Sequence, residues 1–295
     1  MKTKAFIYII LAGVLWGTSG VFAHYLKLYG FTAFQMTAVR ASVSFLCLLI
    51  FALLKDRKLF RVKPIHLILF ASIGTSLFFT ASCYFLSMQM TSVSTAVVLM
   101  YTAPIYVIVF SALFMKERLT PLKLTAIIGM LVGCCLVSGI IGGLRFDASG
   151  ILLGILSGIA YAAYNVLTKI AMQLKLAPVS VTLYSFAFMS FIALFFSSPK
   201  SMAESISSSP AITLPLILSL GVCTFVIPYM LYTLAMKELS AGTASALGIV
   251  EPMAATVFSV LLFKEALDTF STVGIILILA SIVAMSKTEK SPTQK

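Results

Sequence analysis

The sequence is short of charge. Only 10% of its 295 residues are Asp, Glu, Lys or Arg, whereas 60% are hydrophobic. Soluble domains carry about 25% charged residues, so this shortage excludes an ordinary water-soluble domain and indicates an all-α polytopic membrane protein. Acidic residues are the scarcest, with 9 against 21 basic ones, and the net charge is +12. Because the basic residues lie in short segments between apolar runs, we attribute this charge to membrane orientation and not to nucleic-acid binding.

Residues that carry catalytic or metal chemistry are also few. All five cysteines fall within apolar runs and form no CxxC pair, and the two histidines, His24 and His66, lie at predicted helix ends without metal-site spacing. The sequence contains no phosphate-binding loop and no nucleophile–base pattern. We therefore expect no enzyme activity, no metal, no cofactor and no coupling to ATP within this chain.

Long apolar runs dominate the sequence instead. A helix needs about 20 apolar residues to cross a bilayer. On this measure the sequence predicts ten transmembrane helices, near residues 5–26, 34–54, 67–87, 94–115, 121–141, 149–171, 179–197, 211–235, 242–263 and 270–286. The longest connection, about 198–210, is rich in serine, and we expect it to be a flexible polar loop too small for a soluble domain.

The basic residues predict the orientation of these ten helices in the cell membrane. An even number of crossings places both termini on one side, and that side receives sixteen of the Lys and Arg residues. The opposite side receives four, and Arg40 remains inside a span. Since basic residues accumulate in cytoplasmic loops, we expect both termini to be cytoplasmic.

The two halves of the sequence resemble each other. Pro104 matches Pro252, and Tyr84 matches Tyr232, at a common shift of 148 residues. Near the start of each half, Gly13-x-x-Trp16 matches Gly158-x-x-Tyr161 at a shift of 145. Five helices per half is an odd number, so the second copy must enter the membrane in the opposite direction. The sequence thus predicts two inverted five-helix repeats, residues 1–143 and 144–295, with any substrate site at their interface near the midplane.

Three segments resemble a known family. GVLWGTSGVF, YTAPIYVIVFSALFMKERLT and EPMAATVFSVLLFKEAL are similar to segments of EamA-type permeases of the drug/metabolite transporter superfamily. The resemblance covers essentially the whole chain as two EamA repeats. It implies a permease with a central cavity that works by alternating access and exports amino acids or other small metabolites. The two halves differ at one telling position, because Ala103 precedes Pro104 where Glu251 precedes Pro252.

Glu251 and Arg40 are the charged residues placed well inside predicted helices. A charged side chain at the bilayer centre costs about 2.5–3.5 kcal/mol on insertion scales, so Glu251 is expected to face a cavity or a partner. The alternative is a protonated packing residue on a helix kinked by Pro252. Because burial disfavours the charged form of a carboxyl, proton coupling through Glu251 is a hypothesis. Arg40 could bind a carboxylate or phosphate, pair with Glu251, or extend to the outer headgroups.

Aromatic residues with a polar tip complete the predicted substrate site. Trp16, the single tryptophan, lies within a span and not in the interfacial belt where tryptophans collect. Such residues suit an amphipathic cavity, although they also pack between helices. The predicted substrate-binding residues are Trp16, Arg40, Tyr84, Tyr101, Tyr161, Asn165, Tyr232 and Glu251.

Two functions compete with export of a small molecule. A lipid flippase would need a lateral opening between helices, and an integral-membrane enzyme acting on lipid-linked substrates would need a cluster of acids or histidines at one membrane face. The lone Glu251 argues against the enzyme. The partners we expect are a small-molecule substrate and the bilayer itself.

Overall fold

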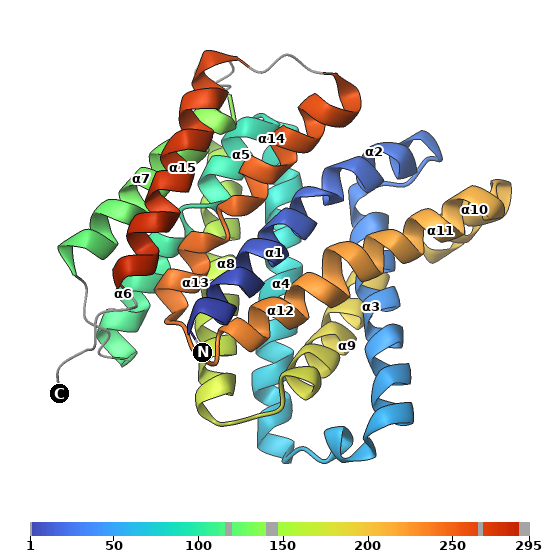
Figure 1. Cartoon of the computed structure of the whole chain (residues 1–295). Coiled ribbons are helices and arrows are strands. Elements are labelled where there is room, and N and C mark those ends of the chain that lie inside the picture. The colour runs from blue at the N-terminus through green and yellow to red at the C-terminus, as the bar shows by residue number, and fades with distance from the viewer. Residues whose placement is uncertain (1, 116–119, 140–146, 265–267, 289–295) are drawn as a thin grey trace.

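The computed structural model describes residues 2–115, 120–139, 147–264 and 268–288, and within these ranges it is built from helices without strands (Figure 1). Two short segments are a 3₁₀ helix, η1 (Arg57–Phe60), and a π-helix, η3 (Val222–Val226). The α-helices are α1 (Lys2–Gly17), α2 (Ser19–Leu28), α3 (Ala33–Lys55), α4 (Pro64–Met90), α5 (Val93–Met100), α6 (Ala103–Met115), α7 (Pro121–Val137), α8 (Ala148–Gln173), α9 (Pro178–Phe196), α10 (Pro199–Ser208), α11 (Pro210–Gly221), α12 (Ile227–Ala235), α13 (Ala241–Leu247), α14 (Val250–Phe263) and α15 (Thr269–Thr288).

Helix length and apolar composition confirm the predicted fold class. Nine stretches of the described residues are long and apolar enough to cross a membrane, several of them made of two consecutive helices. The shorter apolar helix α7 has 17 residues and supplies the tenth crossing. The predicted boundary between the repeats, at residues 143 and 144, lies outside the described residues. The chain is thus a multi-pass helical membrane protein.

The spans that contain Pro104 and Pro252 are each broken into two helices, where the sequence predicted one membrane-crossing stretch each. A proline ring clashes with the carbonyl four residues earlier, which disfavours a continuous α-helix from Met100 into Pro104 and from Gly248 into Pro252. The chain therefore separates α5 from α6 and α13 from α14. The break leaves little backbone unsatisfied, because the Glu251 N–H donates to the Gly248 carbonyl at 2.9 Å.

Residues 198–210 form helix rather than the flexible loop that we expected. Pro199 starts α10 at a position where a missing N–H costs nothing, and α11 follows from Pro210. Met202 and Ile206 of α10 pack against a small buried cluster of Leu26, Phe31, Val39, Ile217 and Leu220. This apolar contact orders a segment whose composition alone suggested disorder.

The repeats pack through a pair of matching close contacts. α1 lies against α12 and α14, and α8 lies against α4 and α5. A Cβ added at Gly13 of α1 would lie 2.8 Å from the Val250 Cβ, and one added at Gly158 of α8 would lie 2.8 Å from the Leu99 carbonyl oxygen. Only glycine allows each first helix of one repeat to approach the broken helix of the other so closely.

Candidate functional site

A cavity of about 1120 Å³ lies between the repeats. We call the end of the bundle where α1 begins and α15 ends the terminal end, and the opposite end the far end. The cavity extends from Tyr161 and Glu251 near the middle of their spans to Lys27, Gln89 and Asp268, which lie at the far end. It is therefore accessible from the far end.

Two lysines form hydrogen bonds at the terminal end. Lys169 of α8 donates from Nζ to the carbonyl oxygens of Met236 at 2.8 Å and Leu239 at 2.7 Å. Lys123 of α7, which is buried, donates from Nζ to Ser240 Oγ at 2.8 Å. Both lysines thereby hold the connection between α12 and α13, which lies beside the start of α1 in Figure 1. We call these contacts the lysine latch.

Glu251 lies where the two helix breaks meet. It is in the first turn of α14, and its Oε2 accepts a hydrogen bond of 2.6 Å from the Tyr101 hydroxyl. Tyr101 follows the last residue of α5, so the bond joins the break of one repeat to the break of the other. The positive end of the α14 dipole further favours a carboxylate at this position. Both side chains line the cavity.

Arg40 also lines the cavity. Its guanidinium carbon Cζ lies 4.5 Å from the centroid of the Phe225 ring, in a cation–π contact. Its Nε is buried and makes no hydrogen bond. Among the residues that the structure describes, Arg40 and Glu251 do not form the ion pair that was one of the three predicted alternatives.

Aromatic rings make up much of the cavity wall. Of the predicted site residues, Trp16, Tyr84, Tyr101 and Tyr161 line it together with the two charged ones. The ring of Trp16 lies 5.0 Å from that of Tyr229, edge to face. Tyr229 lines the cavity too, although it is not among the site residues predicted from the sequence. Its spacing of four residues from Phe225 was the signal that could have found it, because both lie on one helical face.

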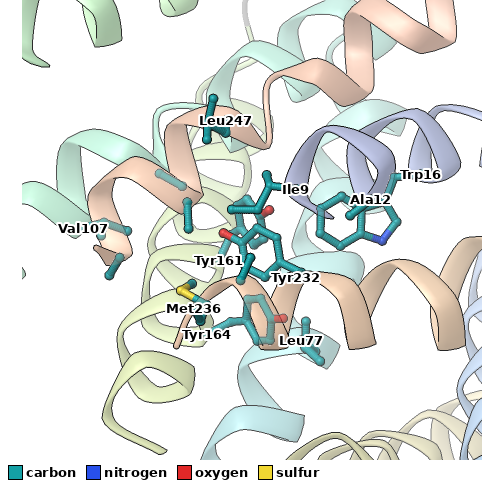
Figure 2. Close-up of a cluster of buried hydrophobic side chains, with 14 of the residues drawn as sticks. Ile9, Ala12, Trp16, Leu77, Val107, Tyr161, Tyr164, Tyr232, Met236 and Leu247 are labelled. Atoms are coloured by element: carbon teal, nitrogen blue, oxygen red, sulfur yellow. The ribbon is translucent and has the colours of Figure 1, made fainter. Parts of the chain in front are cut away.

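Asn165 and Tyr232 do not line the cavity. Both are fully buried, and the Tyr232 hydroxyl donates to Asn165 Oδ1. Asn165 Nδ2 in turn donates to the backbone carbonyl of Tyr161 at 2.7 Å. Figure 2 shows Tyr232 beside Tyr161 and Trp16, in the buried cluster between α1, α8 and α12. The structure places these two residues behind the cavity wall, where they support Tyr161.

The chain matches the model of one protein family twice, at residues 3–139 and 148–287, and that family is described as the EamA-like transporter family. The chain belongs to the EamA-like transporter family. Among similar members, an uncharacterized transporter of Archaeoglobus fulgidus is 31% identical over 93% of both chains. The uncharacterized inner membrane transporter YicL of Salmonella typhimurium is 26% identical over 96% of this chain and 95% of its own.

A solved crystal structure shares the fold of this EamA-like transporter. It superposes with a TM-score of 0.77 at 17% sequence identity, covering 99% of this chain and 100% of the other. Membership of this family establishes the protein as a membrane transporter. It also explains why three segments of the sequence are similar to segments of EamA-type permeases.

The chemistry available in this EamA-like transporter is polar recognition within an aromatic wall. Within the described ranges, His, Cys, Asp and Glu side chains form no group of three that could hold a metal ion. The deep part of the cavity instead presents one guanidinium, one carboxylate and several ring edges and hydroxyl groups. These groups can bind and orient a small amphipathic molecule.

Proposed function

We propose that this protein is a secondary transporter that exports small metabolites such as amino acids across the cell membrane. The observation that carries this proposal is the cavity between the repeats, which reaches both helix breaks and is closed at one end. A site at a repeat interface, built on discontinuous helices, is the arrangement that transporters with inverted repeats use. Family membership supports transport but leaves the substrate and direction to this proposal.

Alternating access follows from the same arrangement. With sixteen basic residues on the side of the termini and four on the other, the terminal end faces the cytoplasm. The present structure then corresponds to an outward-facing state, in which the lysine latch seals the cytoplasmic end. The inward-facing state requires the latch to open and the far end to close around Glu251 and Tyr101.

The energy source that we propose is the proton gradient. Glu251 is the acidic side chain within the deep part of the cavity, so it is the group that can carry a proton between the two states. The sequence contains no ATP-binding loop that would offer another source within this chain.

Reconstituted protein tests the proposal directly. Proteoliposomes would be loaded with unlabelled amino acids, and the exchange of labelled ones would be measured with and without a pH gradient. We expect saturable exchange of at least one amino acid, and accumulation that depends on the gradient. Empty liposomes provide the background. If no labelled amino acid or other small metabolite moves faster than in empty liposomes, the proposed function is wrong.

A further inference from the structure

Arg40 lines the cavity and carries a buried nitrogen that makes no hydrogen bond. Burying a guanidinium normally requires a hydrogen-bonded anion, because the charge loses its hydration. Arg40 Nε is nevertheless buried without a hydrogen bond, and the side chain forms no ion pair within the part of the chain that the structure describes. Glu251, the nearest candidate in the cavity wall, accepts its hydrogen bond from Tyr101 instead.

Arg40 lines the cavity, and its guanidinium contacts an aromatic ring. The Phe225 ring stands against the guanidinium with its centroid 4.5 Å from Cζ. An arginine carries five N–H donors directed outward in the plane of its guanidinium, so a cation–π contact does not exhaust its capacity to bind an anion. Phe225 is itself fixed, because its ring packs 4.7 Å from Tyr229 and 5.2 Å from Phe186.

We propose that Arg40 binds the carboxylate of a small zwitterionic substrate, whose ammonium group faces Glu251. This inference rests on the proposed function and names the substrate class of the same cavity. A guanidinium binds a carboxylate through two parallel N–H bonds, which fixes both the position and the orientation of the ligand. Arg40 lies on α3 and Glu251 on α14, so one ligand engages both repeats at once.

The charges of the cavity favour a zwitterion over a phosphate or a simple anion. The other basic residues of the lining, His24 and Lys27, are on α2 toward the far end, so Arg40 is the cation at depth. A doubly charged phosphate would leave one charge uncompensated beside Glu251. A neutral ligand that carries one charge of each sign complements both side chains. The rings of Trp16 and Tyr229 then face the apolar part of the ligand.

Ligand binding to purified protein in nanodiscs tests this assignment. The probes are the standard amino acids, together with the carboxyl-amidated and N-acetylated derivative of each one that binds. We expect the amidated derivatives to bind at least about tenfold more weakly, since a charge-assisted pair is lost. We expect Arg40→Gln to weaken binding of the unmodified amino acid by a similar factor. This variant should bind the amino acid and its carboxyl-amidated derivative with equal affinity.

Two variants separate recognition from folding. Arg40→Lys keeps the charge but not the planar fork, and we expect it to restore part of the binding. Arg57→Gln removes an exposed basic residue of η1 and serves as the matched control, with binding unchanged. A single peak in size-exclusion chromatography identifies the folded variants. If Arg40→Gln fails to fold, the binding affinity of Arg40→Lys is compared with that of the wild type instead.

Several outcomes would overturn the assignment. Equal binding of an amino acid and its amide by the wild-type protein would exclude the carboxylate contact. Arg40-dependent binding of inorganic phosphate or phenyl phosphate, with no binding of amino acids, would replace the zwitterion by a phosphate. If amino acids are transported equally by wild type and Arg40→Gln, the subsite is wrong while the proposed function stands.

Discussion

Glu251 lies in the first turn of α14 and accepts a hydrogen bond from Tyr101 of the opposite repeat. Its substitution therefore tests the proposed proton coupling. Glu251→Gln keeps the shape of the side chain but cannot exchange a proton. We expect it to retain substrate exchange, at higher substrate concentration, and to lose accumulation driven by a pH gradient. Both are measured in proteoliposomes. Full gradient-driven transport by this variant would make Glu251 a packing residue.

Trp16 and Tyr161 occupy matching positions in the two repeats, and both line the cavity. Aromatic contacts contribute about 0.5–1.5 kcal/mol beyond area burial, so Trp16→Ala and Tyr161→Ala should each raise KM several-fold. Membrane abundance should stay the same. Phe195→Ala, at a ring that is 83% exposed on the outer surface of α9, is the matched control and should transport normally. Unchanged KM in both cavity variants would assign these rings to packing.

Of the eight predicted site residues, six line the cavity, and Asn165 and Tyr232 do not. Tyr84 and Tyr232 match at a shift of 148, yet Tyr84 lines the cavity and Tyr232 does not. In η3 the Ile227 N–H bonds to the Val222 carbonyl, five residues earlier. Helix α4, which carries Tyr84, has no such turn, so residues at matching positions of the two halves need not face the same way. Hydrophobic periodicity gives no sign of such a turn.

Helices α1 and α8 pack closely on the broken helices through Gly13 and Gly158. A methyl group added at either glycine would disturb this packing. A Cβ at Gly158 would meet a backbone carbonyl at 2.8 Å, which cannot rotate away. Overpacking costs about 1–3 kcal/mol, so Gly13→Ala and Gly158→Ala should lower both the melting temperature and transport. Gly20→Ala is the control, because a Cβ there meets nothing within 4 Å. Equal stability of all three variants would contradict the packing described here.

The lysine latch should govern which end of the molecule is open. Lys169→Met removes two charge-assisted hydrogen bonds, each worth about 1.5–3 kcal/mol, from the closed end. We expect the variant to populate the opposite state more often. Ser94 lines the far part of the cavity. A single cysteine introduced at this position should react more slowly with an impermeant thiol reagent in Lys169→Met than in the protein that keeps Lys169.

The control for the latch is Lys175→Met, at an exposed lysine beyond the end of α8. It should leave the labelling rate of the Ser94 cysteine unchanged. A rate that also stays unchanged in Lys169→Met would show that the two hydrogen bonds do not set the balance between states.

For the whole molecule, the distribution of basic residues predicts the orientation in the membrane. We expect a reporter fused to the C-terminus to be cytoplasmic, and a cysteine at Thr32, between α2 and α3, to be labelled from outside. Labelling in intact cells with an impermeant reagent measures both. An externally labelled C-terminus would reverse the orientation and make the present cavity inward-facing.

The architecture was predictable from the sequence to a large extent, because membrane spans and inverted repeats leave strong signals in apolar run length and in matched prolines. Two features needed the structure. The spans at Pro104 and Pro252 are interrupted and each consists of two helices, and the opposing repeat packs closely against both. α10 packs against α2 and α3, which are distant from it in sequence, and against α11, which follows it.

The fluorescence of the single tryptophan should report on the state of the cavity. Trp16 is 5% exposed, its indole lies beside the rings of Tyr229 and Tyr232, and it lines the cavity. Because no other residue of the chain is a tryptophan, the tryptophan fluorescence of the unmodified protein arises from this one position in the cavity wall. A ligand that displaces water there, or a closure of the far end, changes the polarity around one indole and therefore its emission.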